Sequence, residues 1–180
     1  MQQVPVPPRL LAHLLIVHDV AAKLIEKLDC AFPNLSLDRD AVRFGASVHD
    51  IGKAIILNEL VEPGEEHELR GAELLRGMGV PEDRARFAYT HGRWRETEGL
   101  KLEDLLVALA DKCWKGKRVE DLERKTTELL SAASGRPVWA CFAELDSILE
   151  LLARDADSRL AWQASLSASG QVDPYTFPRV

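Results

Sequence analysis

The sequence has few cysteines and no cysteine pair. Cys30, Cys113 and Cys141 are odd in number and form no CxxC motif, which argues against a disulfide framework and against a zinc knuckle. No apolar run approaches the roughly 20 residues that a membrane helix needs. Residues 1–8 contain two adjacent prolines and no positive charge, unlike a signal peptide. We therefore expect a protein of the reducing cytoplasm with no membrane contact.

Positive charge is also in short supply. The chain has 23 lysines and arginines against 29 aspartates and glutamates, a net charge of -6, whereas nucleic acids are held mainly by positive charge on their phosphates. General binding to DNA or RNA is therefore not expected. A small phosphorylated substrate remains compatible with this charge, because a bound metal can locally outweigh the charge of the whole chain.

Strand-like alternation of apolar and polar residues is missing too, and apolar residues instead recur at the helical spacings of three and four. This pattern predicts helices over residues 10–28, from Ser36 or Asp38 to His49, and over 66–78, 81–91 and 137–152. A further helix from 102 either ends at Trp114 or continues to Leu130. We predict an all-α fold with one compact helical domain over residues 1–155. Residues 156–180 are expected to form a C-terminal helical turn and tail, loosely docked from Ser165. The oligomeric state stays open, a homodimer included.

What the chain does contain is a spaced series of histidines and aspartates: His13, the adjacent pair His49 and Asp50, then His67, His91 and Asp111. Asp111 ends the apolar run 105–110, where a lone ionised carboxylate would cost several kcal/mol without a partner. His49 and Asp50 close another mostly apolar helix. One shared metal would give a partner both to Asp111 and to the His49–Asp50 pair.

Imidazole nitrogens and carboxylate oxygens are the ligands of several divalent metals. They suit iron, manganese, zinc, nickel or magnesium better than copper(I), which favours sulfur. Water bound to such an ion loses a proton near neutral pH, and the resulting hydroxide can attack phosphorus while the metal stabilises the developing charge. The series therefore predicts a site for one or two divalent ions.

Four segments carry a more specific pattern. Residues 47–53 read SVHDIGK, residues 67–75 read HELRGAELL, residues 89–92 read YTHG and residues 109–112 read LADK. These segments resemble the HD superfamily of metal-dependent phosphohydrolases, which are all-helical enzymes with a histidine, a His-Asp pair and a distal aspartate. The order of the histidines and aspartates is most similar to that of HD proteins that hydrolyse diadenosine tetraphosphate symmetrically. The resemblance covers about residues 9–120.

The resemblance implies roles for individual residues. His13, His49, Asp50 and Asp111 would form the minimal metal site, and His67 and His91 would complete a second metal position or a phosphate-facing wall. Asp50, Asp111 and Lys53 are the expected catalytic residues, with Lys53 neutralising a substrate phosphate oxygen; the alternative for Lys53 is a solvated charge at a helix end. Lys115, Lys117 and Arg118 either extend the surface for an anionic substrate or form a solvated face.

Two histidines compete for the N-terminal ligand. The family histidine is usually followed by valine after four residues and alanine after eight, and His13 obeys this with Val17 and Ala21. His18 does not, although its separation of 31 residues from His49 is closer to the family's usual one than the 36 of His13. We prefer His13, because its apolar stripe lies on the expected side of the helix.

The function that the resemblance implies is hydrolysis of a phosphate ester or anhydride, with a nucleotide as the expected substrate. The main rival is an HD module that binds a metal or nucleotide and regulates without turnover. A di-iron oxygenase is a third possible function. The segment between His49 and His67 is short, and Glu68 follows His67 where the most similar proteins vary, so the nucleotide-binding wall is expected to differ from theirs.

Overall fold

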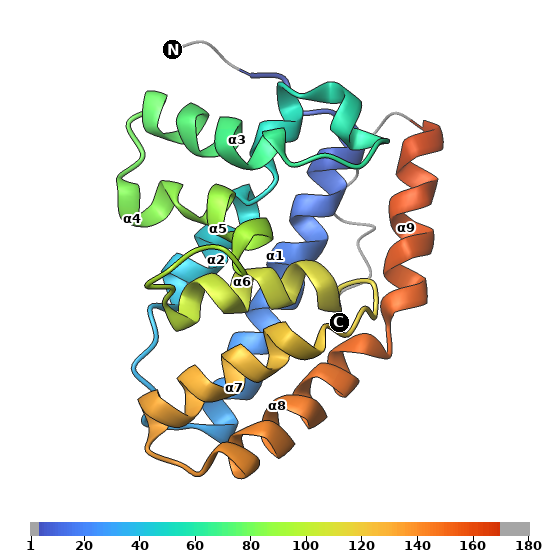
Figure 1. Ribbon diagram of the computed structural model, residues 1–180. Coiled ribbons are helices and arrows are strands. Elements are labelled where there is room, and N and C mark those ends of the chain that lie inside the picture. Colours follow the sequence, from blue (N-terminus) through green and yellow to red (C-terminus); the bar gives the residue numbers. More distant parts are fainter. Residues whose placement is uncertain (1–3, 170–180) are drawn as a thin grey trace.

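The computed structural model describes residues 4–169, and these residues form helices with no strand among them (Figure 1). The elements are α1 (Pro8–Ala31), α2 (Arg39–Val48), the 3-10 helices η1 (Ile51–Ala54) and η2 (Leu57–Leu60), α3 (Glu66–Gly77), α4 (Glu82–Ala85), α5 (Phe87–Arg93), α6 (Leu102–Cys113), α7 (Glu120–Ser134), α8 (Val138–Ala153) and α9 (Ala156–Ser169). The predicted all-α fold is confirmed. Within the described part of the chain, no helix is long and apolar enough to cross a membrane.

Helix α1 is the central element of the fold. It packs against α2, α6, α8 and α9, and Figure 1 shows it running through the middle of the molecule. Ile16, Val20, Leu24 and Leu28, at spacings of four, are essentially fully buried. Each such side chain stabilises the fold by roughly 1.5–3 kcal/mol relative to an exposed one. The apolar stripe of α1 therefore organises the core around which the polar site residues are placed.

Helix α6 crosses this core and is buried along most of its length. All residues from Leu105 to Ala110 are buried, so the chain delivers Asp111 to the interior at the end of the helix. Of the two predicted ends of this helix, the one near Trp114 is confirmed and the continuation to Leu130 is wrong. Gly116 adopts a left-handed conformation with φ of 71°, which ends the helix, and α7 starts only at Glu120.

Three other boundaries differ from the prediction. Asp38 caps α2 by accepting from the Ala41 amide at 2.9 Å, and the helix ends at Val48, so the His49–Asp50 pair lies in the turn before η1. The helix expected over 81–91 is divided into α4 and α5 at Arg86, whose guanidinium Nε donates to the buried Asp104 at 2.9 Å. Where a helical turn was expected after residue 155, the chain forms α9, and residues 170–180 of the expected tail lie outside the described residues.

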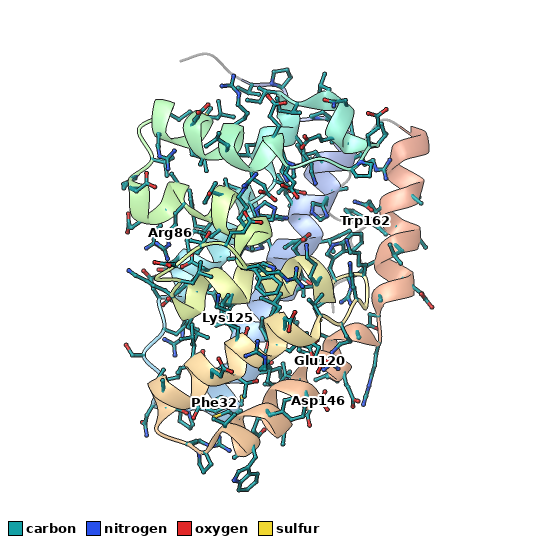
Figure 2. All side chains as sticks on the ribbon, in the orientation of Figure 1. Phe32, Arg86, Glu120, Lys125, Asp146 and Trp162 are labelled. Atoms are coloured by element: carbon teal, nitrogen blue, oxygen red, sulfur yellow. The ribbon has the colours of Figure 1, made fainter. Side chains whose placement is uncertain are left out.

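Helix α9 is held against the rest of the helical bundle by two buried side chains, Trp162 and Arg159. Figure 2 shows Trp162 on the side of α9 that faces α1, and its side chain is buried. Arg159 is fully buried, and its Nε donates to the Trp114 carbonyl at 2.7 Å. Its second amino group donates to the Leu152 carbonyl. Arg159 thus satisfies carbonyls at the C-terminal ends of α6 and α8, where helices lack internal donors.

Candidate metal centre

The structure brings six widely separated side chains together in one cluster. They come from five places in the fold: His13 from α1, His49 and Asp50 from the turn after α2, His67 from α3, His91 from α5 and Asp111 from α6. Five of the six are buried, and the His13 side chain is 12% exposed. These are the six residues that the sequence predicts as ligands. His18, the competing N-terminal candidate, is not among the grouped ligand atoms.

Asp50 stands at the centre of this cluster and uses both oxygens. Its Oδ2 lies 3.1 Å from Nε2 of His13. Its Oδ1 lies 3.0 Å from Nε2 of His67 and 3.2 Å from Nε2 of His91. Among the described residues, two groups of ligand atoms are compact enough for an ion: His13 with His49 and Asp50, and Asp50 with His67 and His91. Asp50 is the member that both groups share.

Three of the histidines are oriented by a hydrogen bond at Nδ1, the ring nitrogen on the side away from the cluster. His49 contacts the Ala46 carbonyl at 3.0 Å, and His91 contacts the Ala88 carbonyl at 3.0 Å. Since a carbonyl oxygen only accepts, Nδ1 of each ring carries the proton. His67 instead meets a carboxylate, Oε2 of Glu59, at 2.5 Å. In each ring Nε2 is left unprotonated toward the cluster, the tautomer that a metal ligand requires.

The cluster contains polar atoms that the protein alone does not satisfy. Asp50 Oδ1 and His67 Nε2 are buried and have no hydrogen bond of good geometry. Such orphaned groups each cost about 1–3 kcal/mol. Nitrogen and oxygen donors of this kind fit a divalent ion of the zinc, manganese, iron or nickel type. The residues present therefore fit a metal at this place.

The pKa values of the buried groups in the cluster are shifted by burial and by their neighbours. Burial alone would raise the pKa of Asp50, but the neighbouring His49 and His13 outweigh it and hold this pKa well below its usual range. Asp111 behaves in the same way, with burial opposed first by the hydrogen bond from His13. Burial lowers the pKa of His91. Both carboxylates are therefore anionic at neutral pH, as ligands must be.

His13 differs from His91, because its pKa is raised. Burial by itself lowers its pKa, but hydrogen bonds to Asp111 and Asp50 and the charges of these carboxylates raise it from 6.5 to about 9. A proton on His13 therefore stabilises the metal-free protein. This contribution is complete below pH 6.5 and is lost as the pH rises through 9.

We accordingly expect the chelator-treated protein to lose roughly 3 kcal/mol of unfolding free energy between pH 6 and 9.5, relative to a His13→Gln variant. The proton on His13 stabilises only the wild type, so subtracting the variant removes the contributions of other groups. Urea denaturation of both proteins at several pH values measures the difference. An equal pH dependence of the two proteins would contradict the shift.

A cavity of about 340 Å³ opens over the cluster and is bordered by four cationic side chains: Arg9, Lys53, Lys112 and Lys115. Lys53 and Lys112 lie 2.6 Å and 2.5 Å from Asp50 and Asp111, respectively. Arg9 and Lys115 form no ion pair with any carboxylate in the described part of the chain. Four carboxylates line the same cavity, those of Asp50, Glu59, Glu68 and Asp111, so Arg9 and Lys115 are the cations that remain unpaired with a carboxylate among residues 4–169.

The predicted basic surface is only partly present. Lys115 borders the cavity, but Lys117 does not. Arg118 is directed away into ion pairs with Glu123 at 2.7 Å and Asp146 at 2.6 Å. Glu68, named from the sequence as a departure in the nucleotide-binding wall, does line the cavity. Four other lining residues escaped the sequence reasoning: Arg9, Glu59, Trp114 and Gln163. Arg9 lies on α1 one turn before His13, a spacing that places both on one face of the helix. Gln163 carries no motif and reaches the cavity through the packing of α9 against α1.

The helical fold and the converging histidines and aspartates define a protein with a His-Asp metal centre. The chain belongs to the HD domain family, whose model matches residues 10–114. This family includes metal-dependent phosphohydrolases, and the match contains all six clustered residues. Comparisons with curated proteins and with solved structures gave no match.

Proposed function

We propose that this protein is a phosphohydrolase that cleaves a phosphate ester or anhydride of a nucleotide with the help of one or two divalent metal ions. The observation that carries the proposal is the position of Asp50, shared between two groups of histidines in a cavity that four cationic side chains border. His13, His49, Asp50, His67, His91 and Asp111 would hold the metal. A divalent ion there would lower the pKa of water and stabilise negative charge on a phosphoryl group.

The lysines at the cavity suit the binding of phosphate. Lys53 and Lys112 have their ammonium groups directly beside the cluster, where each can donate to a phosphate oxygen. Arg9 and Lys115 border the same cavity without a carboxylate partner among residues 4–169, so they are available to an anion. A volume of about 340 Å³ lies in the lower part of the range for small-molecule sites. These features favour a small phosphorylated substrate over a nucleic acid.

The order of the ligands guides the choice of substrate. It is most similar to that of HD proteins that hydrolyse diadenosine tetraphosphate, so dinucleoside polyphosphates are the first compounds to test. Mononucleotides and an aryl phosphate form the comparison set. We place the protein in the cytoplasm, in keeping with its free cysteines Cys30, Cys113 and Cys141.

Removal of the metal is the direct test of this function. Protein stripped by a chelator is expected to lose phosphate release by at least about a hundredfold, because metal catalysis contributes several kcal/mol. Activity should return on addition of iron, manganese, zinc, nickel or magnesium singly. Phosphate release and elemental analysis are measured on the same samples. Failure of every metal and substrate to give turnover would count against a hydrolase.

The outcomes also separate the alternative functions. Stoichiometric metal binding with tight nucleotide binding and no turnover would identify a regulatory module. Oxygen uptake by the iron-loaded protein without phosphate release would identify an oxygenase. Metal-restored phosphate release with no oxygen uptake is the result that we expect.

A further inference from the structure

Glu59 is a buried carboxylate that belongs to none of the motifs. From its position on η2 it reaches the start of α3, where Oε1 accepts from the Glu66 amide at 3.0 Å and Oε2 accepts from the His67 amide at 3.1 Å. Oε2 also lies 2.5 Å from Nδ1 of the His67 ring. Three N–H groups thus fix the carboxylate, and the imidazole is held by a group that is itself immobile.

We propose that Glu59 is a positioning residue that makes the two halves of the metal centre unequal. It orients and polarises His67, and it thereby strengthens the metal position formed by Asp50, His67 and His91 relative to the position formed by His13, His49 and Asp50. The inference rests on the metal centre of the proposed function. It concerns metal binding and not the substrate.

The contrast with the other histidines supports this asymmetry. His49 and His91 are held by neutral carbonyl oxygens three residues earlier in their own segments, an arrangement that local backbone geometry provides. The partner of His67 comes from a different element and carries a full negative charge. A carboxylate behind an imidazole raises the basicity of the ring as a ligand more than a carbonyl does. His67 Nε2 is also a buried nitrogen that lacks a hydrogen bond of good geometry.

The loop that follows η2 is built around this carboxylate. A Cβ atom on Gly64 would lie 2.2 Å from Glu59 Oε1 and 2.4 Å from its carboxyl carbon. Any side chain at residue 64 would therefore displace Glu59 from His67. The loop can pass over the carboxylate only because this residue is glycine.

A purely structural role is the alternative, because Glu59 also accepts from two amides of the first turn of α3. Glu65, which precedes this helix, makes no capping hydrogen bond with its side chain. Glu59→Gln separates the two roles. Glutamine keeps an acceptor oxygen for the helix start but removes the charge behind His67. Glu59→Ala removes both.

The test is a titration of metal-free protein with Mn²⁺ alone, followed by calorimetry and by electron paramagnetic resonance. Wild type is expected to bind two ions and to show the signal of a spin-coupled pair. In Glu59→Gln one of the two affinities, that of the position formed by Asp50, His67 and His91, should fall 10- to 100-fold. The coupled signal should disappear at equal metal concentration, while the other affinity changes little. Glu66→Gln, a substitution of the exposed neighbouring carboxylate, is the control and should match wild type.

Several results would overturn the inference. These are unchanged affinities in Glu59→Gln, an equal loss at both positions, a loss seen only in Glu59→Ala together with a lower melting temperature, or a wild type that binds a single ion. Because no phosphate compound is present, this outcome is independent of the enzymatic proposal. A wild type that binds two ions unequally but hydrolyses nothing would leave the role of Glu59 intact and refute only the proposed function.

Discussion

Replacement of Asp50 by asparagine is expected to reduce metal-dependent phosphate release about a thousandfold, equivalent to about 4 kcal/mol of transition-state stabilisation. Asp50 is the residue that both groups of ligand atoms share. Its two oxygens contact three histidines, His13 through Oδ2 and His67 and His91 through Oδ1. Asparagine has no negative charge and offers only one oxygen, so neither position keeps its full set of ligands.

The effect should be visible in metal content before it is measured in turnover. Elemental analysis of dialysed Asp50→Asn protein should show a loss at both positions, whereas Glu59→Gln affects one. Asp40→Asn is the matched control, because the Asp40 carboxylate is almost fully exposed on α2, at 90%. Retention of two ions and more than a tenth of the activity by Asp50→Asn would show that the shared carboxylate is dispensable.

Substitution of Gly52 by alanine is expected to destabilise the protein by about 3 kcal/mol or more. A Cβ atom on Gly52 would lie 1.9 Å from the His67 carbonyl oxygen and 2.8 Å from the Gly71 amide nitrogen. These neighbours are backbone atoms of α3 and cannot rotate away. The only relief is a separation of η1 from α3, and this would also move Asp50 away from His67.

Urea denaturation and metal titration of Gly52→Ala measure these two consequences together. Gly77→Ala is the control on α3 itself, because a Cβ atom there meets nothing within 4 Å and alanine favours a helix over glycine by up to about 1 kcal/mol. It should leave stability equal or slightly higher. Equal stabilities of the two variants would contradict the close packing of η1 on α3.

The parts of this structure that the sequence predicts are those with a local signal. The stripe of α1 follows from apolar residues at helical spacing. Asp111 stands out because it ends the apolar run of α6, where a charge needs a partner. The competing histidines are also separated by local pattern: Val17 and Ala21, which follow His13 at the family spacings, are both fully buried. His18 is half-buried outside the cluster.

The parts that escape prediction depend on partners distant in the chain. The break at Arg86 lies beside an ion pair with Asp104, 18 residues later, and periodicity within one window does not register such a pair. Glu59 resembles any loop glutamate until η2 is placed against α3. The end of α6 at Cys113, just before Gly116, has a weak signal in the sequence, since a single glycine is tolerated inside many helices.

Arg159 bears on how far the HD unit can be moved between proteins as a module. The family match stops at Trp114, yet the carbonyl of Trp114 receives its hydrogen bond from Arg159, 45 residues further along. Gln163, one turn beyond Arg159, lines the cavity. A graft cut at the family boundary would therefore transfer the ligands without the hydrogen bond from Arg159 that holds the C-terminal end of α6, next to Asp111. For transplantation into a chimera or for circular permutation, the smallest transferable unit of this protein extends at least through α9.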